Sequence, residues 1–466
     1  MQDPVDRLSS SLRNSQMLRL FSIGFLALLL LIPIGMISGL VDERQQRRRD
    51  VLDDITSKWG HAQSLTGPAL VVPYVVRWAE TGPANQTVSR SETRTATFLP
   101  ERLKARGEIA SETRERGIFS VPVYRLGLVV EGEFARPDLA ALGIESTEIL
   151  WHRAQLAIGI ADARAIQQET AVRWNEESID FLPGTGEFAE GGVGIHARLD
   201  LSKAEERYRF SFPLELNGSL ALSFAPFGRQ TDVELVADSE HPSFQGNWLP
   251  VEREIASGRF DARWSIPFLG RNYPQAWRQS DSGDALRNEI AGSHFGVDFV
   301  SPVDHYRMAE RSVKYAGLFI LLTFASVWLV EVLAGLRVHP IQYLLLGGAL
   351  CLFYLLELSL AEHLGFPLAY ALASTAIVAM IGGYAKVVLQ RRSRATVVAA
   401  GVAALYAYLY VLLQNEDYAL LIGSVGLFAI LGSIMYATRQ VDWYAVGRRT
   451  DRGLPPAGGA AAAGAA

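Results

Sequence analysis

Long apolar runs dominate the last third of the chain, with few polar residues between them. A helix needs about 20 predominantly apolar residues to cross the hydrocarbon core of a bilayer. Five runs approach or exceed this length, at residues 315–334, 341–360, 366–389, 396–413 and 418–438. The pattern therefore predicts a bundle of five transmembrane helices over residues 314–438.

A sixth apolar run, residues 18–40, follows a polar N-terminus that contains Arg7 and Arg13. A cleaved signal peptide is the alternative, but its apolar core would span about 7 to 15 residues and end at an Ala-x-Ala-like site. This run is longer, and residues 37–39 match such a site poorly. Pro33 is acceptable inside a membrane helix, where neighbouring groups satisfy the carbonyl that it leaves free. We therefore predict an uncleaved transmembrane helix.

Between these helices the pattern changes from continuous runs to alternation. Residues 41–61 are polar and helix-prone, so we expect them to continue the first helix beyond the membrane. From Leu65 onward, short β-branched and aromatic segments are separated by Gly, Pro and Asn, as half-buried strands are. These segments are residues 69–76, 94–99, 118–124, 126–130, 155–160, 208–212, 219–224, 232–236 and 260–265. They predict a mainly antiparallel β domain, for which a sandwich is one architecture.

Together the patterns predict an α+β membrane protein with six transmembrane helices, one N-terminal and five C-terminal. The β-rich domain is assigned to residues 41–313, outside the cytoplasm, and residues 1–17 form a cytoplasmic N-terminus. Residues 439–466 form a cytoplasmic tail that consists almost entirely of Pro, Gly and Ala after Arg452. This low-complexity composition predicts disorder.

Charges beside the helices predict the orientation. Lys and Arg accumulate in the short cytoplasmic segments of membrane proteins. With a cytoplasmic N-terminus, residues 386–394 and 439–452 lie inside and carry many Lys and Arg, whereas the two short loops left outside carry none. The arginines at 44–49 oppose this orientation, but the reverse one would expel more charges. Both termini are therefore predicted to be cytoplasmic, with residues 42–311 outside.

The predicted outer domain is acidic. Residues 42–313 contain 31 Lys and Arg against 40 Asp and Glu, a net charge of about -9. This balance argues against binding to nucleic acid, whose phosphates require a basic surface, and against broad docking on anionic lipids. The single cysteine, Cys351, lies inside a predicted membrane helix. The outer domain must therefore be stabilised by its own core and not by disulfides.

Catalytic and cofactor motifs are missing from the sequence. No two of the eight histidines lie three or four residues apart, so the usual helical metal pair is absent. We find no nucleophile elbow, Walker loop or dinucleotide fingerprint. The glycine-rich segment 183–196 carries Glu187 and Glu190, which would repel phosphate, so we predict turns between strands there. We expect no cofactor and no enzymatic activity.

Residues 241–250 combine aromatic and turn residues and form a candidate binding loop of the outer domain. Its candidate residues are His241, Phe244 and Trp248. The alternative is an irregular connection between strands, fixed by burial of Phe244 and Trp248. We favour the alternative because buried aromatic rings commonly anchor loops.

Two carboxylates lie inside the predicted membrane helices, where an ionisable group is costly and usually serves a purpose. Glu331 is near the cytoplasmic end of its helix, and Glu357 is near the outer end of the next, antiparallel helix. They are therefore expected to lie about 15 to 20 Å apart, too far for a catalytic dyad. A structural role is favoured over a transport or proton-relay role because both positions are near water.

Polar neighbours extend this set at each membrane face. We expect Glu331 to pair with Arg337 or His339, and Glu357 to pair with His363. The candidate functional residues at the membrane are Glu331, Arg337, His339, Glu357, Glu362 and His363.

Several motifs, in order along nearly the whole chain, resemble those of the CreD family of bacterial inner membrane proteins. They are Pro183-Gly-Thr-Gly186, Gly191-Gly192, His241-Pro-Ser-Phe-x-Gly, Leu249-Pro250, Arg253-Glu254, Pro302-Val-Asp-x-Tyr306, Arg311, Lys314-Tyr315, Arg337-Val-His-Pro-Ile-Gln-Tyr-Leu-Leu345, Glu362-His-x-Gly-Phe366 and Asp442-Trp-Tyr444. The resemblance implies an inner membrane protein tied to envelope integrity and expressed under a two-component system. It implies no catalytic residues.

Our first hypothesis is a non-enzymatic protein that contributes to cell-envelope integrity or the envelope stress response. The bilayer anchors it, and its periplasmic β domain contacts an envelope or periplasmic protein; no nucleic-acid partner is expected. One alternative is a small transporter or channel that uses the intramembrane carboxylates. Against it, the bundle shows no repeated half with broken helices. Another alternative, a membrane-embedded hydrolase, lacks a recognisable nucleophile or metal pair.

Overall fold

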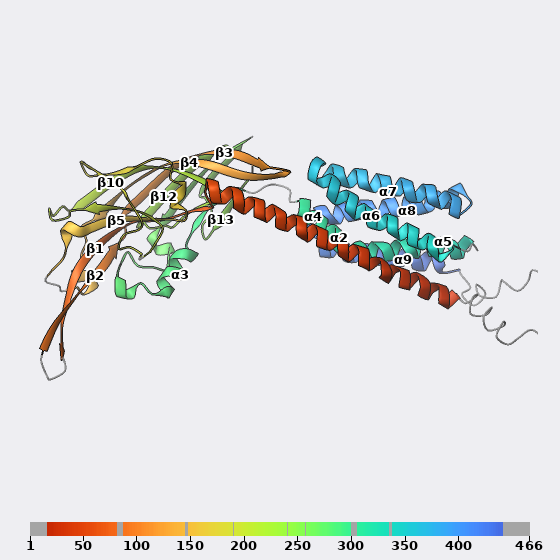
Figure 1. Ribbon diagram of the computed structural model, residues 1–466, viewed down its shortest axis with the longest axis horizontal. Helices are drawn as coiled ribbons and strands as arrows, with labels where there is room; N and C mark the ends of the chain where they lie inside the picture. The colour runs from red at the N-terminus through yellow and green to blue at the C-terminus, as the bar shows by residue number, and fades with distance from the viewer. Residues whose placement is uncertain are drawn as a thin grey trace, which may run out of the picture. The chain divides into compact units, whose positions relative to one another are not determined.

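The structure is a computed structural model in which the chain forms two compact units. One unit comprises Arg48–Pro302, and the other combines Met1–Arg47 with Val303–Ala466. The first is rich in strands, and the second is helical (Figure 1). The structure describes residues 16–81, 87–144, 148–189, 191–239, 241–256, 258–299, 305–334 and 338–440. Arg337 and the motif at residues 442–444 lie outside these ranges, as does nearly all of the predicted tail.

Within the described residues, six helices are long and apolar enough to cross a membrane, which confirms the predicted number and order. The first, α2, has 44 residues and a length of about 66 Å at 1.5 Å per residue, so it continues well beyond a bilayer core, as predicted. The six are α2 (Gln16–Trp59), α5 (Ala316–Ala334), α6 (Pro340–Leu364), α7 (Phe366–Val388), α8 (Arg392–Gln414) and α9 (Ala419–Thr438).

Local sequence sets the ends of the membrane helices. His339 caps α6 through Nδ1, which accepts a hydrogen bond from the Ile341 N–H at 3.3 Å, and Pro340 occupies the first turn, where its missing N–H costs nothing. Gly365 separates α6 from α7 with a φ of 76°, a left-handed value that favours glycine. A further short helix, α4 (His305–Lys314), leads directly into α5.

The helical unit is held by α6 against α7, α7 against α8, and α8 against α5. Aromatic rings fill its centre, with Phe353 centred 4.4 Å from Tyr406 and 5.3 Å from Tyr370. Helix α9 contains no buried residue. It is attached to α8 by the Tyr408 hydroxyl, which donates to the Ile422 carbonyl at 2.8 Å.

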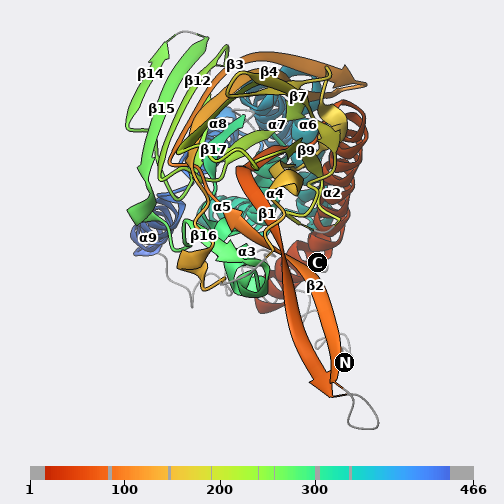
Figure 2. The ribbon, with the colours of Figure 1, turned by 90° about the vertical axis from the view of Figure 1, so that its left-hand side faces the viewer.

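The β unit contains two sheets. The first has nine strands in the order β13 (Pro242–Gly246), β17 (Phe295–Phe299), β11 (Ala221–Phe224), β1 (Gln63–Thr81), β5 (Ala154–Ile160), β9 (Gly194–Leu199) and β8 (Leu182–Pro183), with β2 (Thr87–Phe98) also paired to β1 and β16 (Ala276–Arg278) paired to β2. Figure 2 shows the long ribbon of β1 and β2 projecting from the rest of this unit. One short helix, α3 (Asp284–Gly292), precedes β17.

The second sheet has eight strands. Their order is β14 (Glu252–Ala256), β15 (Arg259–Pro267), β12 (Gln230–Ala237), β3 (Arg102–Arg116), β4 (Phe119–Ala135), β10 (Arg207–Ser219), β6 (Ala171–Trp174) and β7 (Glu177–Asp180). The pairs β1–β11 and β3–β12 are parallel, and the other described pairs are antiparallel. The domain is therefore mixed but mainly antiparallel, as the alternation predicted.

Side-chain alternation builds a single core between the sheets. In β15, Phe260, Ala262, Trp264 and Ile266 are almost completely buried, while the residues between them face outward. Apolar residues from both sheets join the same cluster. The arrangement is a sandwich of two packed sheets.

The glycine-rich segment forms the turns between short strands that its sequence predicts. It joins β8 to β9, which pair antiparallel. Gly184, Gly186 and Gly191 have φ values of 84°, 58° and 70°, which side-chain-bearing residues adopt rarely. The positive φ values of the turns explain why glycines occur here, and a phosphate-binding role is not needed to explain them.

Candidate functional site

Glu357 is the most deeply enclosed carboxylate of the helical unit. It lies on α6 and is 1% exposed. Its Oε2 accepts a hydrogen bond of 2.8 Å from the hydroxyl of Ser312, on the buried face of α4. Its Oε1 has no hydrogen-bond partner among the described residues. The contact joins α4 to α6 inside the bundle.

The predicted partner of Glu357, His363, does not take this role. His363 is exposed at the end of α6, and Ser312 contacts the carboxylate instead. The prediction was wrong because the pairing depends on how α4 packs, and a serine four positions before the start of α5 carries no obvious sequence signal.

Glu362 forms a second contact between α4 and α6. Its Oε1 accepts a hydrogen bond of 3.0 Å from the Tyr306 hydroxyl and lies 3.7 Å from Nε of Arg44 on α2. The Glu362 side chain is only 9% exposed, so this ion pair is largely shielded from solvent. Three helices are therefore linked through one carboxylate.

Arg311 ties α4 to the end of α8. Its guanidinium donates to the carbonyls of Leu413 and Leu412 at 3.2 and 3.3 Å, and it lies 3.6 Å from Glu416. A helix leaves its last carbonyls unsatisfied and carries a partial negative charge there, which an arginine stabilises. Contacts from Tyr306, Arg311 and Ser312 thus make α4 the element that organises this end of the bundle.

Glu331 occupies the opposite end of the bundle. It is 5% exposed, and its two oxygens accept hydrogen bonds from the Val338 N–H at 3.2 Å and the Tyr343 hydroxyl at 2.9 Å. These bonds connect α5 to the start of α6. His339, one of its two expected partners, caps its own helix instead. The other, Arg337, lies outside the described residues, so that pairing stays a prediction.

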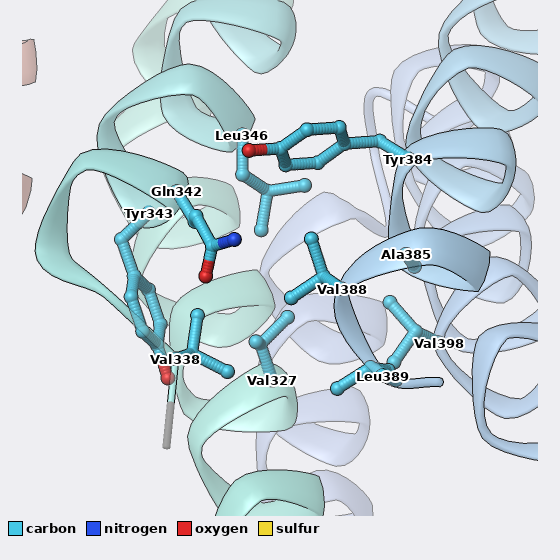
Figure 3. A pocket seen from close by; sticks show the side chains of 10 residues that line it. All are labelled: Val327, Val338, Gln342, Tyr343, Leu346, Tyr384, Ala385, Val388, Leu389 and Val398. Carbon is cyan, nitrogen blue, oxygen red and sulfur yellow. The ribbon is translucent and has the colours of Figure 1, made fainter. Parts of the chain in front are cut away.

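A small cavity beside Tyr343 opens between α5, α6, α7 and α8 (Figure 3). Its volume is about 20 Å³, enough for roughly one water molecule. Val327, Val338, Leu346 and Val388 supply much of an almost wholly apolar lining, while Gln342 and Tyr384 bring the polar groups. The cavity has neither the size nor the charge of a substrate site.

The two intramembrane carboxylates act separately. Tyr343, which binds Glu331, is 14 positions from Glu357 along α6, a rise of about 21 Å. This separation agrees with the expected absence of a dyad. Each carboxylate instead fastens neighbouring helices at its own end of the bundle.

The candidate loop at residues 241–250 is built into the β core. Phe244, on β13, packs edge-on against Phe260 and Trp264, with ring centroids 5.8 and 5.7 Å apart. The Trp264 indole donates to the Trp248 carbonyl at 3.1 Å. His241 is exposed at the start of the segment. Phe244 and Trp248 therefore serve as anchors in this fold.

Three large apolar side chains are exposed near the end of this segment in sequence or in space. Leu269, Val251 and Leu249 are the most exposed large apolar residues of the described β unit, at 82, 70 and 66%. Leu249 follows Trp248 directly, and Leu269 precedes Gly270, which lies next to the Trp248 indole. Leu249 belongs to the candidate loop predicted from the sequence, whereas Val251 and Leu269 were not predicted as site residues.

A buried carboxylate in the β unit also escaped the sequence analysis. Asp162 is 6% exposed, and its oxygens accept hydrogen bonds from Arg164 Nε at 2.9 Å and Nη2 at 3.0 Å. Its Oδ2 also lies 2.9 Å from Nδ1 of His61, at the start of the sheet. Bonding to Arg164 holds the pKa of Asp162 well below its usual range, with His61 adding to the effect.

We expect Asp162→Asn to lower the free energy of unfolding by about 2 kcal/mol at pH 7, because charge-assisted hydrogen bonds are lost. Because the pKa of Asp162 is lower in the folded than in the unfolded state, the carboxylate stabilises the fold fully above the unfolded-state pKa of about 3.9. This stabilisation decreases as the pH falls from that value toward the folded-state pKa. The difference from wild type should therefore shrink at pH 3. Pulse proteolysis of the full-length protein in detergent measures it, with exposed Asp180→Asn as the control. A difference unchanged at pH 3 would contradict this account.

No group of three or more His, Cys, Asp or Glu side chains in the described ranges could hold a metal ion. The polar contacts described above link helices or strands to one another. The chemistry that they supply is hydrogen bonding and charge pairing inside the fold.

Comparison with known proteins places the chain in a family. The sequence profile of the family described as "Inner membrane protein CreD" matches residues 15–444. A relative with the same description, from Escherichia coli (strain K12), is 33% identical over 419 residues, which cover 90% of this chain and 91% of the relative. With its six apolar helices, the chain therefore belongs to the CreD family of multi-pass inner membrane proteins.

Proposed function

We propose that this chain supports the integrity of the bacterial cell envelope without enzymatic activity, and that its β domain is the surface that binds a protein partner. The observation that carries the proposal is the exposure of three large apolar residues, Leu249, Val251 and Leu269, which are 66 to 82% exposed. Exposed apolar surface on a folded domain marks a contact site. Much of the outward face of the second sheet instead carries ion pairs, such as Arg106 with Glu234 and Arg207 with Glu133.

The proposal includes an orientation in which both termini are cytoplasmic and the β domain is periplasmic. The charge pattern of the short loops supports it. Two of the arginines that oppose it have carboxylate partners: Arg44 lies 3.7 Å from Glu362, and Arg47 lies 2.6 Å from Glu43. The charge of each of these two arginines is therefore balanced by a carboxylate.

The intramembrane carboxylates support a structural role for the bundle. Both oxygens of Glu331 and one oxygen of Glu357 bond groups on neighbouring segments. We infer that the bundle is an anchor and that the β domain performs the specific recognition.

Complementation of a deletion strain of the native host tests the proposal. The strain should be more sensitive to bile-salt detergent than its parent, and wild-type chain should restore resistance. A variant with Val251→Lys and Leu269→Lys should reach the membrane in normal amounts but fail to restore resistance, because charge disrupts the apolar surface. Ser89→Lys, on exposed β2, is the matched control. Full complementation by the double variant would refute the proposed surface.

A further inference from the structure

Strand β14 is an open edge of the second sheet. It pairs with β15 on one side, and no described strand pairs with its other side. All five of its residues are exposed. An edge strand presents unpaired N–H and C=O groups that can bond another extended chain.

The core-facing side of β14 carries two uncovered apolar residues, one on each side of Arg253. Residues opposite each other in a sheet point to the same face, and Ile255 is opposite Phe260, which is fully buried in the core. By alternation, Val251 shares this face with Ile255, and Arg253 lies between them. Val251 and Ile255 are 70 and 51% exposed. The apolar inner surface of the sandwich therefore continues past its last covered strand.

The outer side of the same edge carries two acidic residues on neighbouring strands. Glu254 lies directly opposite Asp261, and both are exposed. Neither has an ion-pair partner within the described residues, whereas nearby Glu252 lies 3.5 Å from Arg263. Like charges directly opposite each other destabilise a sheet. A positive group from another molecule would relieve this repulsion.

We propose that β14 binds an extended segment of a partner protein as an additional strand, in which apolar residues alternate with basic ones. The apolar residues lie on the same face of the sheet as Val251 and Ile255, and the basic residues lie on the same face as Glu254 and Asp261. The backbone bonds supply general affinity, and the two faces supply specificity. This inference rests on the proposed function and specifies the partner's chemistry. The same acidic pair disfavours anionic lipid as the occupant.

Peptide binding to the full-length protein in detergent micelles tests the inference. The probes are a fluorescent peptide of alternating lysine and valine, about seven residues long, and its counterpart of alternating glutamate and valine. Wild-type protein should bind the basic peptide saturably and with clear preference. The double variant Glu254→Lys with Asp261→Lys should bind it at least about tenfold more weakly and should now prefer the acidic peptide. A reversed preference cannot result from unfolding.

Glu177→Lys, on the opposite edge strand β7, is the matched control and should bind the basic peptide as wild type does. Equal binding of both peptides, no saturable binding, or a preference unchanged in the double variant would each overturn the inference. The proposed function would survive such a result if Val251→Lys with Leu269→Lys still failed in complementation. If that variant complemented fully, the proposed function would fail as well.

Discussion

Trp264→Ala is expected to destabilise the β domain by about 4 kcal/mol, within the range for truncating a buried tryptophan. Trp264 is fully buried on β15, and its ring centroid lies 5.7 Å from those of Phe244 and Phe295. Truncation leaves a large cavity and removes the indole donor of the Trp248 carbonyl. Pulse proteolysis of the full-length protein in detergent measures the change in unfolding free energy.

Trp78→Ala is the control, since Trp78 is 42% exposed on β1. Loss of this partly exposed ring should change stability by less than about 1 kcal/mol. Similar losses of unfolding free energy for the two variants would contradict the view that the core between the two sheets stabilises the domain.

Much of the fold could be predicted because hydrophobic pattern is a local signal. The membrane helices were located to within a few residues, and β15 shows the strict alternation of a half-buried strand. β3 was missed because its buried positions include Ala105 and Gly107, which give a weak apolar signal between charged neighbours. β4 was predicted as two segments because Arg125 interrupts its sequence, although this arginine faces outward and the strand continues.

Pairings between distant residues could not be predicted from local pattern. The parallel pairs β1–β11 and β3–β12 join segments more than 100 residues apart. Ser312 reaches Glu357 from 45 positions away and only because α4 packs on α6. The carboxylates themselves were recognisable, since charge inside an apolar run is conspicuous, but their partners depend on tertiary packing.

At the open edge of β14, too, the sequence shows which residues are present, but only the strand pairing shows how they are arranged. The exposed apolar residues and acidic side chains of this segment are visible in the sequence, but their faces follow from the register of β14 on β15. A shift of one residue would move Ile255 to the outer face and Glu254 to the inner one. Only the structure therefore shows that the exposed apolar residues and Glu254 lie on opposite faces of an edge strand.

Cysteine accessibility is expected to give an all-or-none result for the proposed orientation. Ser89→Cys, on exposed β2 of the β domain, should react with a membrane-impermeant maleimide in intact spheroplasts. Ser393→Cys, exposed at the start of α8 between Arg392 and Arg394, should react only after the membrane is broken. The physical reason is the accumulation of Lys and Arg around residue 393, which favours the cytoplasmic side.

The native cysteine provides an internal control for this labelling. Cys351 is 6% exposed within α6, so the parent protein should remain unlabelled in spheroplasts. Both variants should label equally once the membrane is permeabilised, which shows that each thiol is reactive. Labelling of Ser393→Cys from outside, with Ser89→Cys protected, would show that the protein has the opposite topology. The β domain would then face the cytoplasm, and β14 would have to find its partner strand there.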